Sequence, residues 1–280
     1  MGRRDALAAA AERGVSADEP RRDERPGRPR AAPENPLVAR GDGPIVPPPD
    51  MTRSPPLVVA LDGPAGSGKS TVAKALAQAL GWAHLDTGAM YRAVTWQAMQ
   101  RQVALTDGAA VAALAAAAHV DVDPSTGRVT IDGADVTGPI RTQAVDAGVS
   151  VVAAIGRVRD VMRRHQRAFA ARFGRIVAEG RDMGTRVFPD AVLKVFLVAT
   201  VEERVRRRVA ELTARGAGVD PETVRGALVE RDRQDGSRDV DPLRPAADAV
   251  EVDTTGRTPA QVVAQILALV SSRVLPSETA

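Results

Sequence analysis

The residues best suited to chemistry form a short glycine-rich segment that ends in a lysine and two hydroxyl side chains. It matches the pattern G-x-x-x-x-G-K-[S/T] without a mismatch and comprises Gly63, Pro64, Ala65, Gly66, Ser67, Gly68, Lys69, Ser70 and Thr71. Glycines allow backbone N–H groups to turn toward phosphate oxygens, and the Lys69 ammonium suits β- and γ-phosphates. The Ser70 hydroxyl is a typical partner for Mg²⁺ held through a nucleotide. This segment, the phosphate loop, therefore predicts a nucleoside triphosphate site.

Two further groups of polar residues are expected close to the phosphate loop. Thr87, Tyr91 and Arg92 open a helix directly after an expected strand, and Arg181 and Asp182 follow another strand. Ligands of open α/β sheets bind beyond the carboxyl ends of strands, so both groups are candidates for holding an anionic acceptor. A simpler interpretation remains open for each group. The first could be an N-capped helix with a surface arginine, and the second a structural ion pair.

A charged run from Arg231 to Arg238 is a third candidate, and it includes Asp235. It falls at the end of an expected helix. Such a run is usually a solvated helix face. In a kinase, the same arginines could instead belong to a mobile lid that closes on the transferring phosphoryl group.

The spacing of apolar residues predicts alternating strands and helices around these groups. Apolar runs predict buried strands at 57–61, 176–178 and 192–198. Two more strands are expected, one at 250–252 and one ending at Asp86. Helical periodicity predicts helices at 70–80, 87–101, 141–173 (two), 200–212, 219–235 and 259–271. Thr200 and Glu203 have the spacing of a capping box, and alternating runs at 120–136 predict an antiparallel meander. The expected fold class is α/β, a doubly wound parallel sheet with a small antiparallel insert.

Composition separates the first 56 residues from the rest of the chain. They hold more than half of the 20 prolines and few large apolar residues. Such a segment cannot bury enough apolar surface to offset the chain entropy lost on folding. We therefore expect residues 1–56 to be a disordered extension, with Met51 as an alternative start. Residues 57–274 are expected to form the folded domain, and 275–280 a short tail.

The overall charge and the missing motifs narrow the function. The formal net charge is only +3, which disfavours a nucleic-acid partner. The chain has no apolar stretch of membrane length, which disfavours a membrane partner, and the absence of cysteine favours a cytoplasmic protein. No guanine-reading Asn-Lys-x-Asp follows the phosphate loop, which disfavours a GTPase. No long apolar strand ends in paired acids, which disfavours a motor or transporter ATPase. A kinase for a small acceptor is the remaining interpretation.

Six segments, taken in order, give a family resemblance. The segments are GPAGSGKST, LDTGAMYR, IRTQAV, EGRDMGT, VFPDA and RDRQDGSRD. Over about residues 57–270 they closely resemble blocks of the bacterial cytidylate kinases, which are phosphate-loop nucleoside monophosphate kinases. The resemblance implies transfer of the ATP γ-phosphoryl group to CMP or dCMP, with Mg²⁺ as cofactor. It further implies a monomer with a nucleoside-monophosphate-binding insert at about 107–144 and a helical lid at about 215–240.

The resemblance also assigns roles in phosphate binding. Arg92, Arg181 and Arg238 would hold the acceptor phosphate. Lys69, Arg181 and Arg238 would act directly on the transferring group. Gln234 departs from the family pattern, because some relatives carry a further lid arginine there, and this removes one phosphate contact from the expected set.

Base recognition is implied for Ser150, Arg159 and Asp182. Cytosine presents the N4 amino donor beside the N3 and O2 acceptors, so an aspartate with an arginine is complementary to it, whereas uracil would set O4 against the carboxylate. The other implied pocket residues are Arg231 and Asp235 at the sugar hydroxyls, and Thr87 and Tyr91 along the wall. Two alternatives remain: a shikimate-type kinase, which needs no base-reading pair, and a nucleotide-gated binding module without turnover.

The composition of the N-terminal segment leads to a prediction. A chain that begins at Met51 should keep the activity and the Tm of the full chain, because residues 1–50 lack the apolar side chains to pack on a core. Limited proteolysis of the full chain should cut first at Arg21, Arg22, Arg25, Arg28 and Arg30. Loss of activity or unfolding of the shortened chain would contradict this prediction.

Overall fold

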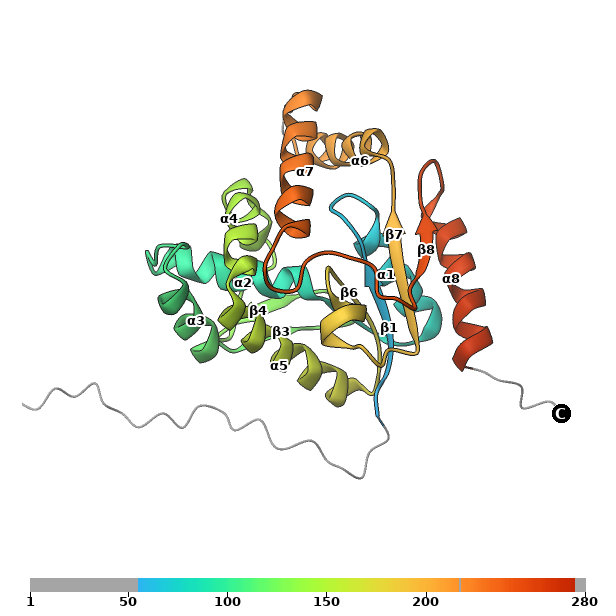
Figure 1. Ribbon diagram of the computed structural model, residues 1–280. Coiled ribbons are helices and arrows are strands. Elements are labelled where there is room, and N and C mark those ends of the chain that lie inside the picture. The colour runs from blue at the N-terminus through green and yellow to red at the C-terminus, as the bar shows by residue number, and fades with distance from the viewer. Residues whose placement is uncertain (1–54, 217, 275–280) are drawn as a thin grey trace, which may run out of the picture. The chain divides into compact units, whose positions relative to one another are not determined.

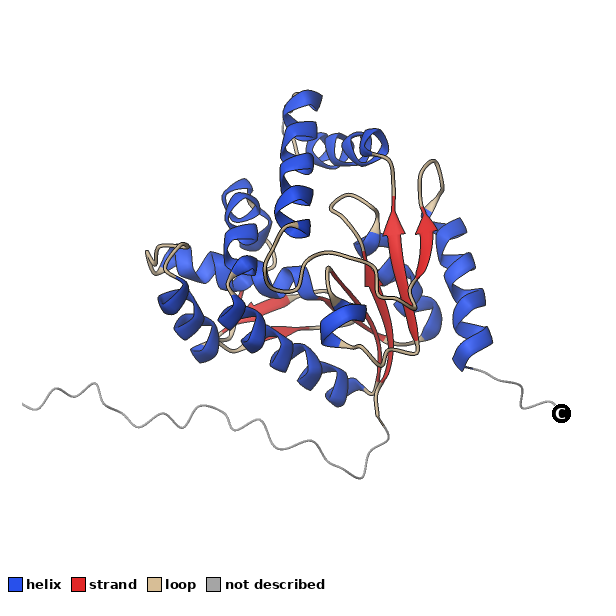
Figure 2. Cartoon of the chain, viewed as in Figure 1, coloured by secondary structure: helices blue, strands red, loops and turns tan. Residues whose placement is uncertain are grey.

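The computed structural model describes residues 55–216 and 218–274, and its main element is a parallel sheet (Figures 1 and 2). Its five strands are β1 (Leu57–Asp62), β2 (Ala83–Asp86), β6 (Arg175–Gly180), β7 (Leu193–Val198) and β8 (Val250–Asp253). They lie in the order β2-β6-β1-β7-β8, and every pairing is parallel. The predicted fold class is therefore confirmed. The expectations for residues 1–54 and 275–280 lie outside the described residues.

Helices cover both faces of this sheet, which explains the continuous apolar runs of its strands. They are α1 (Lys69–Leu80) and α8 (Pro259–Val274) on one face, and α2 (Thr87–Gln100) and α5 (Gly156–Phe173) on the other. Alternate residues of β1 serve the two faces: Val59 and Leu61 pack with α1 and α8, while Val58 and Ala60 pack with α2 and α5. Among the described helices, none is long and apolar enough to cross a membrane.

The insert between α2 and α5 contains the predicted meander and an additional helix. Its elements are α3 (Gly108–Ala117), β3 (Val120–Val122), β4 (Val129–Ile131), β5 (Ala134–Asp135), the 3₁₀ turn η1 (Pro139–Arg141) and α4 (Gln143–Ala154). The three strands form the antiparallel sheet β3-β4-β5, and α4 and α5 are the two helices predicted within 141–173. The helix α3 was not predicted.

Two helices stand beyond the carboxyl ends of the strands, and we call them the lid helices (Figure 1). They are α6 (Val201–Ala214) and α7 (Pro221–Gly236). Val205, Val224 and Leu228 form a small apolar cluster between them that also contacts Ala65 of the phosphate loop. The lid helices therefore pack directly on the loop, with a core separate from those on the two faces of the sheet.

The capping box predicted at the start of α6 is only half correct. The Thr200 hydroxyl accepts a hydrogen bond from the Glu203 N–H at 3.3 Å, as predicted. The return bond does not form, because the Thr200 N–H donates to the Thr255 hydroxyl. The Glu203 carboxylate instead accepts from Arg206 and Arg207. Guanidinium donors one helical turn away thus replace the backbone donor that a capping box uses.

Candidate active site

The phosphate loop connects β1 to α1, and the glycines at its two ends, Gly63 and Gly68, have positive φ, as does Gly66 between them. Gly63 has φ 150°, and a Cβ there would lie 2.2 Å from the carbonyl oxygen of Leu197. Gly68 directly precedes α1 with φ 90°. A side chain at either position would clash or be strained. The loop therefore leads closely past β7 and presents the first turn of α1, with its free N–H groups, to the carboxyl edge of the sheet.

Lys69 is buried beneath the loop, with 6% of its surface exposed. Its Nζ donates to the carbonyl oxygen of Pro64 at 2.7 Å and lies 3.4 Å from the Ser67 hydroxyl. Burial lowers the pKa of Lys69 well below its usual range, and the guanidiniums of Arg181 and Arg231 act in the same direction. A buried cation with cationic neighbours favours an anion beside it, which phosphate oxygens would provide.

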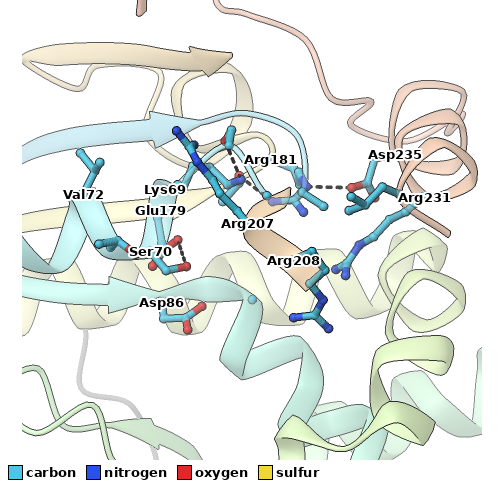
Figure 3. A pocket seen from close by; sticks show the side chains of 18 of the residues that line it. Lys69, Ser70, Val72, Asp86, Glu179, Arg181, Arg207, Arg208, Arg231 and Asp235 are labelled. Carbon is cyan, nitrogen blue, oxygen red and sulfur yellow. Dashed lines mark hydrogen bonds and ion pairs between the residues drawn. The ribbon is translucent and has the colours of Figure 1, made fainter. Parts of the chain in front are cut away.

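Ser70 faces a carboxylate from the neighbouring strand. Its hydroxyl donates to Glu179 Oε2 at 2.6 Å (Figure 3). His84 Nε2 lies 3.0 Å from Glu179 Oε1. The Thr87 hydroxyl donates to the carbonyl oxygen of Glu179 at 2.6 Å. A hydroxyl and a carboxylate oxygen side by side are the donors that Mg²⁺ prefers. The residues present at the end of the loop therefore fit this ion.

One cavity of about 890 Å³ joins the phosphate loop to the predicted acceptor residues. Its lining includes residues 65–71 of the loop but not Gly63 or Pro64. It also includes the whole predicted acceptor set: Thr87, Tyr91, Arg92, Ser150, Arg159, Arg181, Asp182, Arg231, Asp235 and Arg238. These side chains come from α2, α4, α5, α7, the segment after β6 and the loop after α7. The fold thus brings together residues that are widely separated in sequence, and their individual roles stay predictions.

The end of the cavity near α5 holds a buried ion pair. Arg159 Nη2 donates to Asp182 Oδ2 at 2.5 Å, and the two side chains are 2% and 5% exposed. The Arg159 guanidinium also lies 5.7 Å from the centre of the Tyr91 ring. Because Asp182 Oδ2 is already occupied by Arg159, its Oδ1 is the oxygen available to a ligand donor. Burial raises the pKa of Tyr91, so its phenol remains a neutral donor.

Another part of the cavity lining is rich in arginine. Arg92 pairs with Asp146. Arg181 Nε donates to Asp235 at 2.7 Å (Figure 3). Arg231 lacks such an acid: within the described residues its buried Nε has no hydrogen-bond partner. Burial, together with Arg181 and Arg92, lowers the pKa of Arg231 to about 10. This part of the cavity lining therefore carries positive charge that an anionic ligand would neutralise.

The simpler interpretations of the helix that carries Arg92 and of the charged run 231–238 are only partly correct. Asp86 does cap α2, since its carboxylate accepts from the Ala89 N–H, but the Arg92 side chain is only 12% exposed and is not a surface arginine. In the charged run, Arg233 is exposed, as expected of a solvated face. Asp235, two residues later, is buried. The charged run therefore includes residues exposed to solvent and residues that line the cavity.

Comparison with known proteins decides the family. The family model described as cytidylate kinase matches residues 59–272. A cytidylate kinase of Streptomyces avermitilis is 47% identical over 223 residues, which cover 78% of this chain and 94% of that protein. The chain belongs to the cytidylate kinase family. A cytidylate kinase of Pseudomonas aeruginosa is 48% identical, over 75% of this chain and 93% of that protein. A bifunctional pantoate ligase/cytidylate kinase of Trichodesmium erythraeum is 47% identical, over 75% of this chain and 40% of that protein.

Membership of the cytidylate kinase family confirms the resemblance, but the structure adds cavity residues that the sequence did not single out. Arg141, Arg207 and Arg208 line the cavity and bring further positive charge to it. Arg208 Nη2 donates to Asp146 at 2.7 Å, and Asp146 is also the partner of Arg92. Arg207 and Arg208 lie within an arginine-rich stretch of α6 that resembles a solvated face, so sequence alone gave no signal for them. Arg141 belongs to the IRTQAV block, which could have indicated it.

Asp62, at the end of β1, is a second residue that the sequence did not single out. It is 4% exposed, and its Oδ1 and Oδ2 accept from the Met183 and Gly184 N–H groups, each at 2.8 Å. Burial raises the pKa of Asp62 to about 6 despite these two bonds. The carboxylate ties the strand before the phosphate loop to the turn η2 (Met183–Val187), which directly follows Arg181 and Asp182. It therefore fixes the donor and acceptor sides of the cavity to each other.

We expect Asp62→Asn to lower the free energy of unfolding by about 1–3 kcal/mol. The amide would turn an N–H donor toward one of two backbone N–H groups and leave that group without an acceptor. Urea unfolding of this variant should be compared with that of Asp190→Asn, an identical change at an exposed position of the same protein. Equal stability of the two variants would show that the Asp62 carboxylate does not hold η2 in place.

Proposed function

We propose that this protein transfers the γ-phosphoryl group of ATP to CMP or dCMP and produces CDP or dCDP and ADP. Membership of the cytidylate kinase family supports this reaction. The observation that carries it is one cavity that is lined both by the phosphate loop and by the buried Asp182–Arg159 pair. A triphosphate donor and a nucleoside monophosphate acceptor would meet in that cavity.

The donor end would bind ATP through the backbone of residues 63–71 and the Lys69 ammonium. Ser70 and Glu179 would hold Mg²⁺ together with the phosphates, and this ion, when bound, neutralises phosphate charge. His84 lies against the other oxygen of Glu179 and keeps that carboxylate in place. The chain's contribution at this end is thus to bind and orient the phosphates. Chemistry of this kind requires no covalent intermediate on the protein.

The acceptor phosphate would be held by Arg92, Arg181 and Arg238. A nucleoside monophosphate carries about two negative charges near pH 7, and planar guanidiniums can bind such a group from several sides. The buried Nη2 of Arg238 has no hydrogen-bond partner among the described residues, which supports a role in ligand binding. Arg231 and Asp235 would contact the sugar hydroxyls.

Cytosine would be read by Ser150, Arg159 and Asp182. Asp182 Oδ1 would accept from the N4 amino group, and the free N–H groups of Arg159 would donate to N3 or O2. Uracil carries a carbonyl at position 4 and an N–H at position 3, so the contacts to these two positions would become repulsive, whereas a bond to O2 would carry no discrimination. Tyr91 and Thr87 would line the pocket wall, and the Thr87 hydroxyl is restricted to accepting, because its proton is donated to Glu179.

Transfer would rely on positioning and on charge. Lys69, Arg181 and Arg238 approach the cavity from different elements, so they could surround the phosphoryl group as it moves from donor to acceptor. The insert at about 107–144 would bind the monophosphate, and the segment at about 215–240 would act as the lid. By family resemblance we further propose that the protein is a cytoplasmic monomer that acts on small nucleotides.

A coupled assay of ADP release tests this proposal. ATP and Mg²⁺ would be incubated with CMP, dCMP, UMP, AMP or shikimate as the acceptor. We expect rapid ADP release with CMP and dCMP and slower release with the others. Release that depends on shikimate would indicate a different kinase, and ATP binding without acceptor-dependent release would indicate a binding module.

A further inference from the structure

A buried carboxylate outside the cavity lining connects the loop after α7 to the proposed base pocket. Asp241 is 6% exposed and forms ion pairs with three arginines from other parts of the chain. Its Oδ2 accepts from Arg159 Nε at 3.0 Å and from Arg163 Nη2 at 2.8 Å, and its Oδ1 accepts from Arg186 Nε at 2.6 Å. Arg159 and Arg163 belong to α5, and Arg186 to η2.

These three arginines differ in their freedom to move. The Arg163 and Arg186 side chains are 22% and 55% exposed, so without Asp241 they could turn toward water. The Arg159 side chain is 2% exposed and has no such alternative. A buried guanidinium keeps its charge and needs acceptors around it. The Asp241 charge therefore matters most for Arg159.

Three acceptors fix the orientation of the Arg159 guanidinium. Asp241 accepts from its Nε, Asp182 from its Nη2 at 2.5 Å, and the carbonyl oxygen of Ala153 from its Nη1 at 3.0 Å. Three of the five N–H donors of the guanidinium are thus committed, which leaves two for a ligand. The directions of those two donors depend on Asp241, because rotation about the side chain would break its bond to Nε.

The backbone at Asp241 is adapted to this contact. Asp241 has φ 50°, the left-handed region that aspartate and asparagine tolerate better than most residues. Two residues later, the Leu243 N–H donates to the carbonyl oxygen of Asp235 at 2.8 Å and closes the loop back onto α7. The short segment 235–243, which begins in the last turn of α7, therefore carries Asp235, which lines the cavity, and Asp241, which contacts Arg159 from outside the cavity lining.

We propose that Asp241 is a positioning residue for base recognition, which holds Arg159 in the orientation that reads cytosine and so links the loop after the lid helix α7 to the base pocket. This inference rests on the proposed function. Asp241 does not line the cavity and touches no substrate in this scheme. It acts through Arg159, whose donors suit N3 of cytosine and oppose the N–H at the same position of uracil.

The test compares Asp241→Asn with Asp239→Asn. Asparagine keeps the side-chain volume and tolerates the positive φ, and Asp239 is an exposed aspartate two residues away. We expect Asp241→Asn to raise the KM for CMP by about 3- to 10-fold and to lower the CMP:UMP ratio of kcat/KM by a similar factor, with the KM for ATP unchanged. Asp239→Asn should leave all of these values unchanged.

A double variant distinguishes an effect of Asp241 on the orientation of Arg159 from a general effect on protein stability. In an Arg159→Met protein, adding Asp241→Asn should not lower the CMP:UMP ratio further, because the residue through which Asp241 acts is absent. The same fall in both backgrounds, or an unchanged ratio in Asp241→Asn, would overturn the inference. If Asp241→Asn does not fold, Asp241→Glu keeps the charge but displaces the carboxylate, and it should also lower the ratio.

Different results would contradict the proposed function and the proposed role of Asp241. If the unmodified protein releases no ADP with CMP, the proposed function is wrong. If it phosphorylates CMP and Asp241→Asn keeps the same ratio and KM, only the role of Asp241 is wrong. Arg163→Met gives a further control, because it removes a different partner of Asp241 and leaves the bond to Arg159 in place. It should keep the CMP:UMP ratio of the unmodified protein.

Discussion

Lys69→Ala is expected to lower kcat at least about a hundredfold, a loss of ~3 kcal/mol in transition-state stabilisation. The ammonium would contact the β- and γ-phosphates and would be needed most while the phosphoryl group is in transit. The Tm should stay the same or rise slightly. Lys69 is a buried charge beside Arg181 and Arg231, and removing it relieves both desolvation and repulsion. Steady-state kinetics and thermal unfolding measure the two effects.

Lys74→Ala provides the matched control for Lys69→Ala. Lys74 lies on the same helix, α1, but it is exposed and does not line the cavity. Its replacement should change neither kcat nor KM for ATP. A folded Lys69→Ala protein with near-normal turnover would remove the basis for assigning residues 63–71 to ATP. A large loss of stability in Lys69→Ala would instead mean that its bond to Pro64 holds the loop together.

Much of the fold could be predicted because its signals are local. The apolar run of β1, the glycines of the loop and the periodicity of α1 lie next to each other in the sequence, and the structure has them as predicted. The helix α3 could not be found this way, because its alanine-rich sequence lacks a polar face that alternates with an apolar one. Its position depends on packing: Val111, Leu114 and Ala115 are buried in the insert's core.

Side-chain partners were harder to predict than elements. The family motif pointed to Asp182 and Arg159, which are 23 residues apart and form the buried pair of the base pocket. Nothing indicated that Asp241, 82 residues from Arg159, would be the second acid on the same guanidinium. A charged segment is predicted to be exposed unless its partners are known, and the partners of Asp241 come from α5 and η2. The same holds for Asp62, whose donors lie 121 and 122 residues away.

Asp182 and Asp241 both pair with Arg159, but replacing one is expected to affect the guanidinium differently from replacing the other. With Asp241 on Nε, the Arg159 charge remains compensated when Asp182 is replaced, so changes at Asp182 can alter recognition without leaving a buried cation unpaired. The converse holds only in part. Without Asp241, Asp182 still balances the charge, but the orientation of the guanidinium is no longer fixed on its Nε side.

Asp182→Asn is expected to lower kcat/KM for CMP by about 10- to 150-fold, which corresponds to roughly 1.5–3 kcal/mol for one charged hydrogen bond in a desolvated pocket. The asparagine oxygen can keep the bond from Arg159. Its amide nitrogen would then face the base and set a donor against the cytosine N4 amino group. The same nitrogen could donate to O4 of uracil, so UMP should lose far less. The CMP:UMP ratio of kcat/KM should therefore fall.

Two controls identify Asp182 as the source of that change. Arg181→Ala should lower kcat/KM for CMP and UMP alike, because a phosphate contact carries no information about the base. Asp190→Asn makes the same chemical change at an exposed position eight residues along the chain and should leave both substrates unaffected. An unchanged ratio in a folded Asp182→Asn protein would place discrimination elsewhere in the pocket. Ser150 and Arg159 would then be the residues to replace, since both line the same cavity as Asp182.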